Sequence, residues 1–178
     1  MTANRLAPRT AAFFDFNGTL VTREVWDAMR SWKRQHGEWR QIERIAMARQ
    51  IPIVLASRVG LLSTDLMVRR WMRAAWRTMR GMDEQALLEL VNYAWDTMFQ
   101  PSTRDRVAQI VAKRKSEGRL AILVSATYEP FLEPAKHRFL FDEVIGTRVE
   151  VRDGRVTGRV LGKAVSYTHL TLPTILLV

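Results

Sequence analysis

The sequence predicts an α/β fold in which a parallel sheet carries a helical insertion after its first strand. Three observations support this: the apolar run at 11–14 stops at a polar turn, residues 23–100 show helical spacing, and a second apolar run at 120–124 precedes another helical segment. Apolar runs bounded by turn residues are typical of buried strands, and strands that alternate with helices are typical of parallel sheets. The length of 178 residues fits one such domain with a modest insertion.

The predicted insertion covers residues 22–100 and follows the strand 11–14. Its helices are expected at Arg23 to His36, Trp39 to about Gln50 with Pro52 interrupting, Ser63 to Arg80, and Asp83 to Gln100. Ser and Asp are common N-caps, Gly commonly follows a helix, and Pro cannot continue one. The expected stop and start signals are therefore Ser63, Asp83, Gly37, Gly81 and Pro101.

Tryptophan is confined to this insertion. With Val68, Met72, Ala75 and Met79 at helical spacing, the tryptophans predict a helical core rather than a ligand-binding aromatic box; they are Trp26, Trp32, Trp39, Trp71, Trp76 and Trp95. The same segment holds an arginine-rich stretch, which predicts a solvated helix face: Arg69, Arg70, Arg73, Arg77 and Arg80.

The rest of the chain continues the alternation of helices and strands. We expect a helix at 103–117, a buried strand at 120–124, a helix at 129–138 and a strand at 143–146. Asp153-Gly154 between 149–151 and 156–160 is a strong hairpin signal. The predicted core therefore comprises residues 11–21 and 101–164.

The last stretch, residues 165–178, differs in composition because no Lys, Arg, Asp or Glu follows Lys163. The ten residues from Val165 to Thr174 resemble one translated frame of the transposon-end adaptor used in preparing sequencing libraries. We expect this tail to be an adaptor-derived addition to a C-terminally truncated chain, which excludes His169 as a catalytic residue.

Composition excludes several classes of protein. The chain carries 28 Lys and Arg against 18 Asp and Glu, a net charge of +10, and has no Cys, which excludes a disulfide framework and a cysteine nucleophile. No signal peptide or membrane span is predicted, so we expect a cytoplasmic protein. The positive charge is spread over the chain without a nucleic-acid-binding motif, so nucleic acid is an unlikely partner.

Two polar groups follow the predicted strands. In open α/β sheets, functional groups gather at the carboxyl ends of strands, where Asp15 and Ser125 lie. A carboxylate there can attack phosphorus and form an aspartyl phosphate if a cation offsets the repulsion between the anions. Gly18 in the turn after Asp15 permits close approach of a phosphate, and Ser125 would add a hydroxyl, with the N–H of Ala126 at the start of the next helix.

These motifs resemble the haloacid dehalogenase-like (HAD) phosphatases, specifically the subgroup with a helical cap that includes the phosphoserine phosphatases. The resemblance rests on Phe13 to Val21, on Ile122 to Ala126, and on the hairpin segment from Thr147 to Gly158. It implies a Rossmann-like HAD core at 11–21 and 101–164, left incomplete by the truncation, and a cap at 22–100. It also implies a phosphomonoester hydrolase acting on a small phosphorylated metabolite.

The resemblance also implies roles for individual residues. Asp15 would be the nucleophile and a Mg²⁺ ligand, and the main-chain carbonyl of Asn17 a second ligand. The phosphate would contact Phe16, Gly18, Thr19, Ser125 and Ala126, with Thr19 also holding the loop. Glu24 stands where phosphoserine phosphatases carry a cap glutamate that meets the substrate amine.

The sequence departs from the family pattern at three places. The family usually has Asp at position 17, and Asn17 can neither protonate a leaving group nor activate water. The cap arginine has no clear counterpart, because Ala75 occupies its expected place between Arg73 and Arg77. The family's later lysine and acidic Mg²⁺ motif would follow the hairpin, and Lys163 comes too soon to be that lysine. We therefore expect the 178-residue chain to be weakly active or inactive.

Three functional hypotheses remain open. The first is a Mg²⁺-dependent phosphatase that acts through an aspartyl phosphate on Asp15. The second is a catalytically degenerate HAD-fold protein, signalled by Asn17, that binds an anionic partner through its basic cap. The third is a nucleic-acid or anionic-membrane surface formed by the arginines of residues 69–80. The natural substrate and the oligomeric state are open as well.

Overall fold

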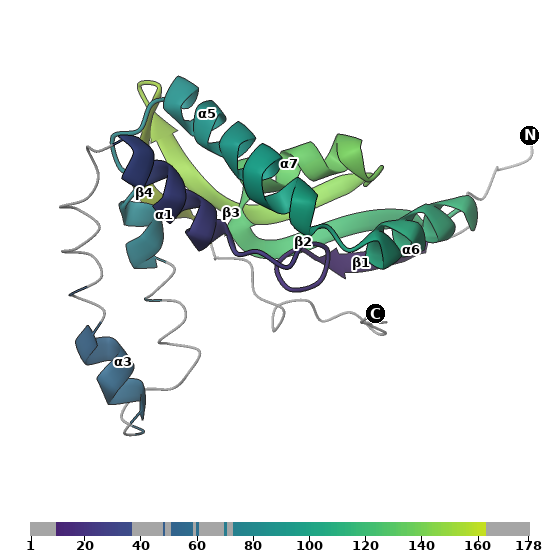
Figure 1. The fold of residues 1–178 in the computed structure, drawn as a ribbon, viewed down its shortest axis with the longest axis horizontal. Coiled ribbons are helices and arrows are strands. Elements are labelled where there is room, and N and C mark those ends of the chain that lie inside the picture. The colour runs from purple at the N-terminus through teal and green to yellow at the C-terminus, as the bar shows by residue number, and fades with distance from the viewer. Residues whose placement is uncertain are drawn as a thin grey trace, which may run out of the picture. The chain divides into compact units, whose positions relative to one another are not determined.

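A four-stranded sheet with the order β1-β2-β3-β4 runs through the molecule (Figure 1). The computed structural model describes residues 10–36, 48, 51–58, 60, 70 and 73–162. The strands are β1 (Ala11–Asp15), β2 (Leu120–Tyr128), β3 (Glu143–Arg152) and β4 (Arg155–Leu161). Strands β1 and β2 are parallel, whereas β3 and β4 form an antiparallel hairpin. The predicted α/β class is confirmed.

Helices connect and flank these strands (Figure 1). They are α1 (Val25–His36), α3 (Ile51–Arg58), α5 (Glu84–Ala94), α6 (Asp105–Ser116) and α7 (Glu129–Arg138), with a π-helix at Trp95–Phe99 and a 3-10 turn at Gln100–Ser102. The predicted helix at 129–138 is confirmed at both ends. The predicted continuous helix to Gln100 is wrong beyond Ala94, because the backbone widens into the π-helix.

Pro52 lies in the first turn of α3, where proline is tolerated because its missing N–H has no helical partner. Its predicted interruption of a preceding helix stays a prediction. Asp83 does cap α5, since its Oδ1 accepts a hydrogen bond of 2.9 Å from the Ala86 amide. The helix expected at 39–50, most of the segment 63–72, Gly37, Lys163 and the tail 165–178 lie outside the described residues.

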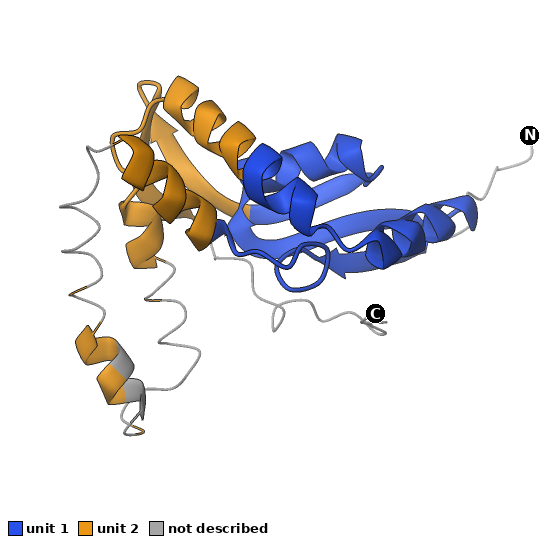
Figure 2. Cartoon of the chain, in the orientation of Figure 1, with its two compact units in different colours: residues 1–25, 95–146, 165–178 blue, residues 26–94, 147–164 orange. Residues whose placement is uncertain are grey.

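The chain divides into two compact units by its internal contacts (Figure 2). Unit 1 comprises Met1–Val25, Trp95–Gly146 and Val165–Val178, and unit 2 comprises Trp26–Ala94 and Thr147–Ala164. This division places residues 95–100 with the sheet and the outer part of the hairpin with the helices, unlike the boundaries expected from the sequence. As domain boundaries, 22–100 for the cap and 101–164 for the core stay a prediction.

An aromatic cluster forms the centre of unit 1. The rings of Phe16, Trp95 and Phe99 contact one another with centroid distances of 5.2–5.9 Å, and each is at most 1% exposed. The Trp95 Nε1 donates a hydrogen bond of 2.9 Å to the carbonyl of Phe131 on α7. Arg138 stacks over Trp95 at 5.1 Å and bonds to Gln100, so the end of α7 is fixed to the π-helix region.

Unit 2 has its own core of helices and hairpin. The tryptophans Trp32 and Trp76 are buried in it, which confirms the helical-core prediction for them, while Trp39 and Trp71 lie outside the described residues. Strand β4 is joined to the turn after residue 80 by the hydrogen bonds Gly81 N to Val156 O and Val156 N to Met82 O, both 2.8 Å. The hairpin turn has Asp153 and Gly154 at positive φ, as the Asp-Gly signal predicts.

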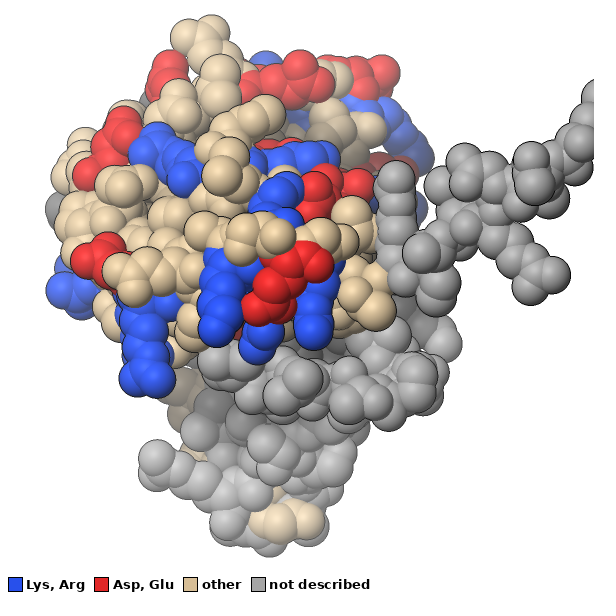
Figure 3. All heavy atoms as spheres, turned by 90° about the vertical axis from the view of Figure 1, so that its right-hand side faces the viewer, with Lys and Arg blue, Asp and Glu red and all other residues tan. Residues whose placement is uncertain are grey.

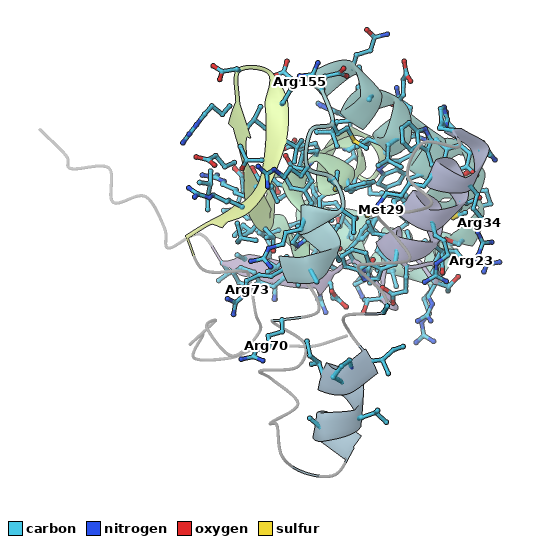
Figure 4. All side chains as sticks on the ribbon, turned by 90° about the vertical axis from the view of Figure 1, so that its left-hand side faces the viewer. Arg23, Met29, Arg34, Arg70, Arg73 and Arg155 are labelled. Carbon is cyan, nitrogen blue, oxygen red and sulfur yellow. The ribbon has the colours of Figure 1, made fainter. Side chains whose placement is uncertain are left out.

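The surface charge is distributed in pairs and small groups. On the face in Figure 3, cationic and anionic side chains alternate, in keeping with ion pairs such as Arg114–Glu117 and Lys115–Asp142. On unit 2, Arg70 and Arg73 are neighbours, whereas Arg34 and Arg155 lie apart from them and from each other (Figure 4). Arg70, Arg73, Arg77 and Arg80 are exposed, as predicted for a solvated face. None of the described helices is long and apolar enough to cross a membrane.

Candidate active site

The candidate site lies at the carboxyl end of β1, where the parallel pairing with β2 stops. Asp15 is the last residue of β1 and pairs in register with Val124, so Ser125 is one residue further along β2. Neighbouring carboxyl ends in a parallel sheet form one edge, and that edge is where α/β proteins place functional groups. The predicted pair of Asp15 and Ser125 is therefore brought to adjacent strands.

The loop after Asp15 is closed by its own backbone hydrogen bonds. The Gly18 amide donates to the Val21 carbonyl at 2.8 Å, and the Thr19 amide donates to the Phe16 carbonyl at 3.4 Å. Gly18 has φ +76°, the left-handed conformation that glycine adopts without strain. Phosphate contact by Phe16, Gly18 and Thr19 stays a prediction.

The side chain of Thr19 is bonded to Asp15. Its hydroxyl donates a hydrogen bond of 3.1 Å to Oδ2 of the carboxylate. The loop thereby orients one oxygen of the Asp15 carboxylate. The predicted role of Thr19 in holding the loop gains this specific contact.

Phe16 serves the loop through its ring. The side chain is 0% exposed and lies between Trp95 and Phe99, at 5.9 and 5.2 Å between ring centroids. A large aromatic ring that is fully buried fixes the backbone on either side of it. Phe16 therefore anchors Asp15 and Asn17 to the aromatic cluster of unit 1.

Thr127 is a site residue that the sequence analysis missed. Its Oγ1 accepts a hydrogen bond of 3.0 Å from Nδ2 of Asn17, across 110 positions of sequence. The other end of the same amide, Oδ1 of Asn17, is buried and has no hydrogen-bond partner among the described residues. The available signal was the two-residue spacing from Ser125, which places both side chains on one face of a strand.

Ser125 and Ala126 lie in a different local structure from the one expected. Strand β2 continues to Tyr128 and α7 begins at Glu129, so Ala126 is a strand residue rather than the start of a helix. The Ser125 Oγ accepts a hydrogen bond of 3.2 Å from the Thr127 amide. A hydroxyl that accepts one hydrogen bond can still donate its proton, which is the contact a phosphate oxygen needs.

Glu24 is exposed and immediately precedes α1 instead of lying in its first turn. Hydrogen bonds at the site join Asp15 to Thr19, Asn17 to Thr127, and Ser125 to Thr127. A role of Glu24 in binding substrate stays a prediction. At the end of β2, burial raises the pKa of Tyr128, with a smaller contribution from the charge of Glu129.

Known proteins resemble this chain over most of its length. It is 28% identical over 159 residues to the "Inhibition of morphological differentiation protein" of Streptomyces azureus, an alignment that covers 88% of this chain and 56% of that protein. The chain thus spans about half the length of this curated relative.

Solved structures show the same fold. A protein of unknown function from Bordetella pertussis Tohama I has a TM-score of 0.69 and 22% identity, over 89% of this chain and 69% of that one. A phosphoserine phosphatase from T. onnurineus has a TM-score of 0.51 and 23% identity, over 88% of this chain and 68% of that one.

A family model also covers nearly the whole described sheet. The model of the haloacid dehalogenase-like hydrolases matches residues 12–169, which include both the Asp15 loop and the Ser125 strand. On this match, together with the fold and the paired strand ends, the chain belongs to the haloacid dehalogenase-like hydrolase family.

Proposed function

We propose that this protein is a phosphomonoester hydrolase that acts through an aspartyl phosphate on Asp15. The observation that carries the proposal is the geometry at Asp15: a carboxylate at the end of β1, bonded to Thr19 at 3.1 Å, on the strand next to the one that carries Ser125. A carboxylate is a competent nucleophile toward phosphorus when the surrounding groups hold the phosphate oxygens. Ser125 is the residue of β2 that would donate to one of them.

The reaction has two chemical steps. In the first, a carboxylate oxygen of Asp15 forms a bond to phosphorus, the bond from phosphorus to the ester oxygen breaks, and the alcohol leaves with a proton from solvent. In the second, water attacks the phosphorus, the bond to Asp15 breaks with its electron pair returning to the carboxylate, and inorganic phosphate leaves. Both steps displace an oxygen at phosphorus in line, so positioning supplies most of the catalysis.

Asn17 restricts the substrates of the first step. An amide has no proton to give to a leaving alkoxide, and general acid catalysis typically contributes about 10²- to 10⁴-fold. Phosphate esters of acidic alcohols, aryl phosphates and acyl phosphates need no such proton. We therefore propose that the enzyme prefers small phosphorylated substrates with good leaving groups.

The donor chemistry at Asp15 fits Mg²⁺. Mg²⁺ prefers hard oxygen ligands and is often held by one or two carboxylates together with waters and substrate phosphate. Asp15 offers a carboxylate and Asn17 a main-chain carbonyl, while the described residues contain no cluster of three acidic or histidine ligands. When bound, the ion would offset the repulsion between the carboxylate and the phosphate. Asp15, Ser125 and Thr19 would orient the nucleophile and the phosphate.

The test is hydrolysis of p-nitrophenyl phosphate in Mg²⁺ by the full-length protein and by its Asp15→Asn variant. The isosteric amide keeps the shape of the site but removes the nucleophile, so we expect turnover to fall by more than about 10³-fold. Asp153→Asn is the matched control, because Asp153 lies in the hairpin turn and asparagine accepts its positive φ of 52°. Undiminished hydrolysis by Asp15→Asn would refute the mechanism.

The asparagine at position 17 favours one alternative, a catalytically degenerate site that binds an anionic partner. Asn17→Asp separates the two functions. An enzyme limited by its missing acid should gain turnover on alkyl phosphates, by about 10²-fold or more. A binding protein should gain none, and its affinity for inorganic phosphate should fall because the new carboxylate repels the anion.

A further inference from the structure

The amide of Asn17 is bonded at one end only. Its Nδ2 donates to Thr127 Oγ1 at 3.0 Å, and its Oδ1 is buried with no hydrogen-bond partner among the described residues. A buried carbonyl oxygen without a donor is energetically unfavourable, so such atoms occur where a ligand or water completes the bond. Oδ1 is thus an acceptor that requires a donor, two residues from the proposed nucleophile.

Thr127 is held firmly enough to fix the amide. Its side chain is 4% exposed, and its N–H donates to Ser125 Oγ at 3.2 Å. Strand β3 passes so close that a Cβ on Gly146 would lie 2.9 Å from the Thr127 carbonyl and 2.8 Å from the Glu129 Cα. Only glycine permits this approach, which clamps the end of β2 between β3 and the start of α7.

The backbone of Asn17 is fixed as well. The loop bridge between Asn17 and Val21 and the buried ring of Phe16 hold it on both sides. With the backbone fixed and Nδ2 bonded to Thr127, rotation of the amide would break that hydrogen bond. The orientation of Oδ1 therefore depends on the Thr127 hydroxyl.

We infer that Thr127 is a positioning residue that holds Asn17 with Oδ1 as the acceptor for the water that attacks the phosphorylated Asp15. This inference rests on the proposed function. An amide oxygen can orient an attacking water without taking its proton, as a glutamine does in GTPases. The water oxygen bonds to phosphorus, the bond to Asp15 breaks, and the water proton leaves with the phosphate product; Asn17 is chemically unchanged.

The two half-reactions should differ in their dependence on Asn17 Oδ1. Transfer of the phosphoryl group to Asp15 involves no water, so it should not depend on Oδ1. Hydrolysis of the aspartyl phosphate does, and the loss of one orienting hydrogen bond of about 1.4 kcal/mol corresponds to about tenfold in rate. A variant without the Thr127 hydroxyl should accumulate the phosphorylated form.

The experiment measures both rates with radiolabelled acetyl phosphate, whose leaving group needs no acid. The full chain is incubated with the probe and Mg²⁺, quenched in acid, and the protein-bound label is followed during formation and after a chase. We expect Thr127→Val, which keeps the shape, to form label at the wild-type rate and lose it about tenfold more slowly. Thr127→Ser should restore the decay, and Thr157→Val, a threonine of β4 in unit 2, should change neither rate.

The failures are distinguishable. If the full-length wild-type protein takes no label, or if its Asp15→Asn variant still takes it, the proposed function is wrong and this inference with it. If label forms on Asp15 but decays from Thr127→Val as fast as from wild type, the inference alone is overturned. It is also overturned if formation and decay slow together with a lower unfolding midpoint, which would indicate a structural role only.

Discussion

At the scale of single residues, the site loop joins a buried aromatic anchor to the half-buried polar groups of the site. Phe16 is 0% exposed and contacts Trp95 and Phe99, while its neighbours Asp15 and Asn17 carry the polar groups of the site. Loops of this kind hold functional groups accurately only when their own side chains are packed. The accuracy of the site therefore depends on an aromatic ring that performs no chemistry.

Phe16→Ala tests this dependence. Removing a fully buried phenylalanine typically costs about 3–5 kcal/mol, so we expect the free energy of unfolding in urea to fall by that amount. Phe16→Leu fills most of the space and should cost much less. A Phe16→Ala protein as stable as the wild type would show that the aromatic cluster does not support the loop.

The sequence predicted the positions of Asp15 and Ser125 but not the contacts that connect them. Asp15 and Ser125 each follow an apolar run, which a search for buried strands finds directly. The hydrogen bond from Asn17 to Thr127 instead joins residues 110 positions apart. Such a contact depends on the strand register, which the sequence pattern alone does not give. Thr127 was also assigned no role because the predicted strand stopped at Val124 and not at Tyr128, although Thr and Tyr both favour strands.

At the scale of elements, the hairpin of β3 and β4 was predicted from its turn, and the π-helix was not predictable. Asp153-Gly154 specifies a two-residue turn by local conformation alone. The π-helix at Trp95–Phe99 instead follows from tertiary packing, because it presents Trp95 and Phe99 to Phe16. An extra residue in a helical turn leaves no mark on helical periodicity in so short a segment.

Strand β4 packs closely on the helical segment before it, and paired glycine variants can measure this. Gly158 and Gly154 both have positive φ, of 76° and 70°, so alanine at either costs about 1–2 kcal/mol in backbone strain. Only at Gly158 would the new Cβ also lie 3.0 Å from the Cα of Arg77. We expect Gly158→Ala to lower the free energy of unfolding by about 1–3 kcal/mol more than Gly154→Ala. Equal losses would mean that β4 and residues 76–80 are not in close contact.

The hairpin also contains a pH-dependent contact. The Thr157 hydroxyl donates to Glu150 Oε2 at 2.8 Å, and this hydrogen bond, followed by the charges of Arg152 and Arg159, lowers the pKa of Glu150 below its ordinary value. A lowered pKa in the folded state gives stability that is present above the ordinary pKa and is lost as pH falls through the folded value. An NMR titration should show the Glu150 pKa rising in Thr157→Val, whereas an unchanged pKa would assign the shift to the arginines.

At the scale of the whole molecule, the described part of the chain shows cations that are paired or set apart. Ion pairs such as Arg114–Glu117 and Lys115–Asp142 offset positive charge on unit 1, and on unit 2 Arg34 and Arg155 lie apart from Arg70 and Arg73 (Figure 4). Nucleic-acid-binding surfaces usually gather their cations into a stripe or patch. Binding of a small anion at Asp15 therefore agrees better with this distribution than binding of a polyanion.

The number of carboxylates that can bind Mg²⁺ has to be considered over the whole chain. Among the described residues no cluster of three metal-binding side chains occurs, while the family resemblance places acidic ligands after the hairpin. We predict that resequencing the source DNA through codon 164, with no adaptor in the read, shows the frame continuing into a lysine and an acidic segment.

A second carboxylate strengthens a site for a hard cation, so the continued chain should bind Mg²⁺ more than about tenfold more tightly than the 178-residue chain in calorimetric titration. Equal affinities, or a frame that ends as printed, would leave Asp15 without its expected partners and favour the binding function over the enzyme.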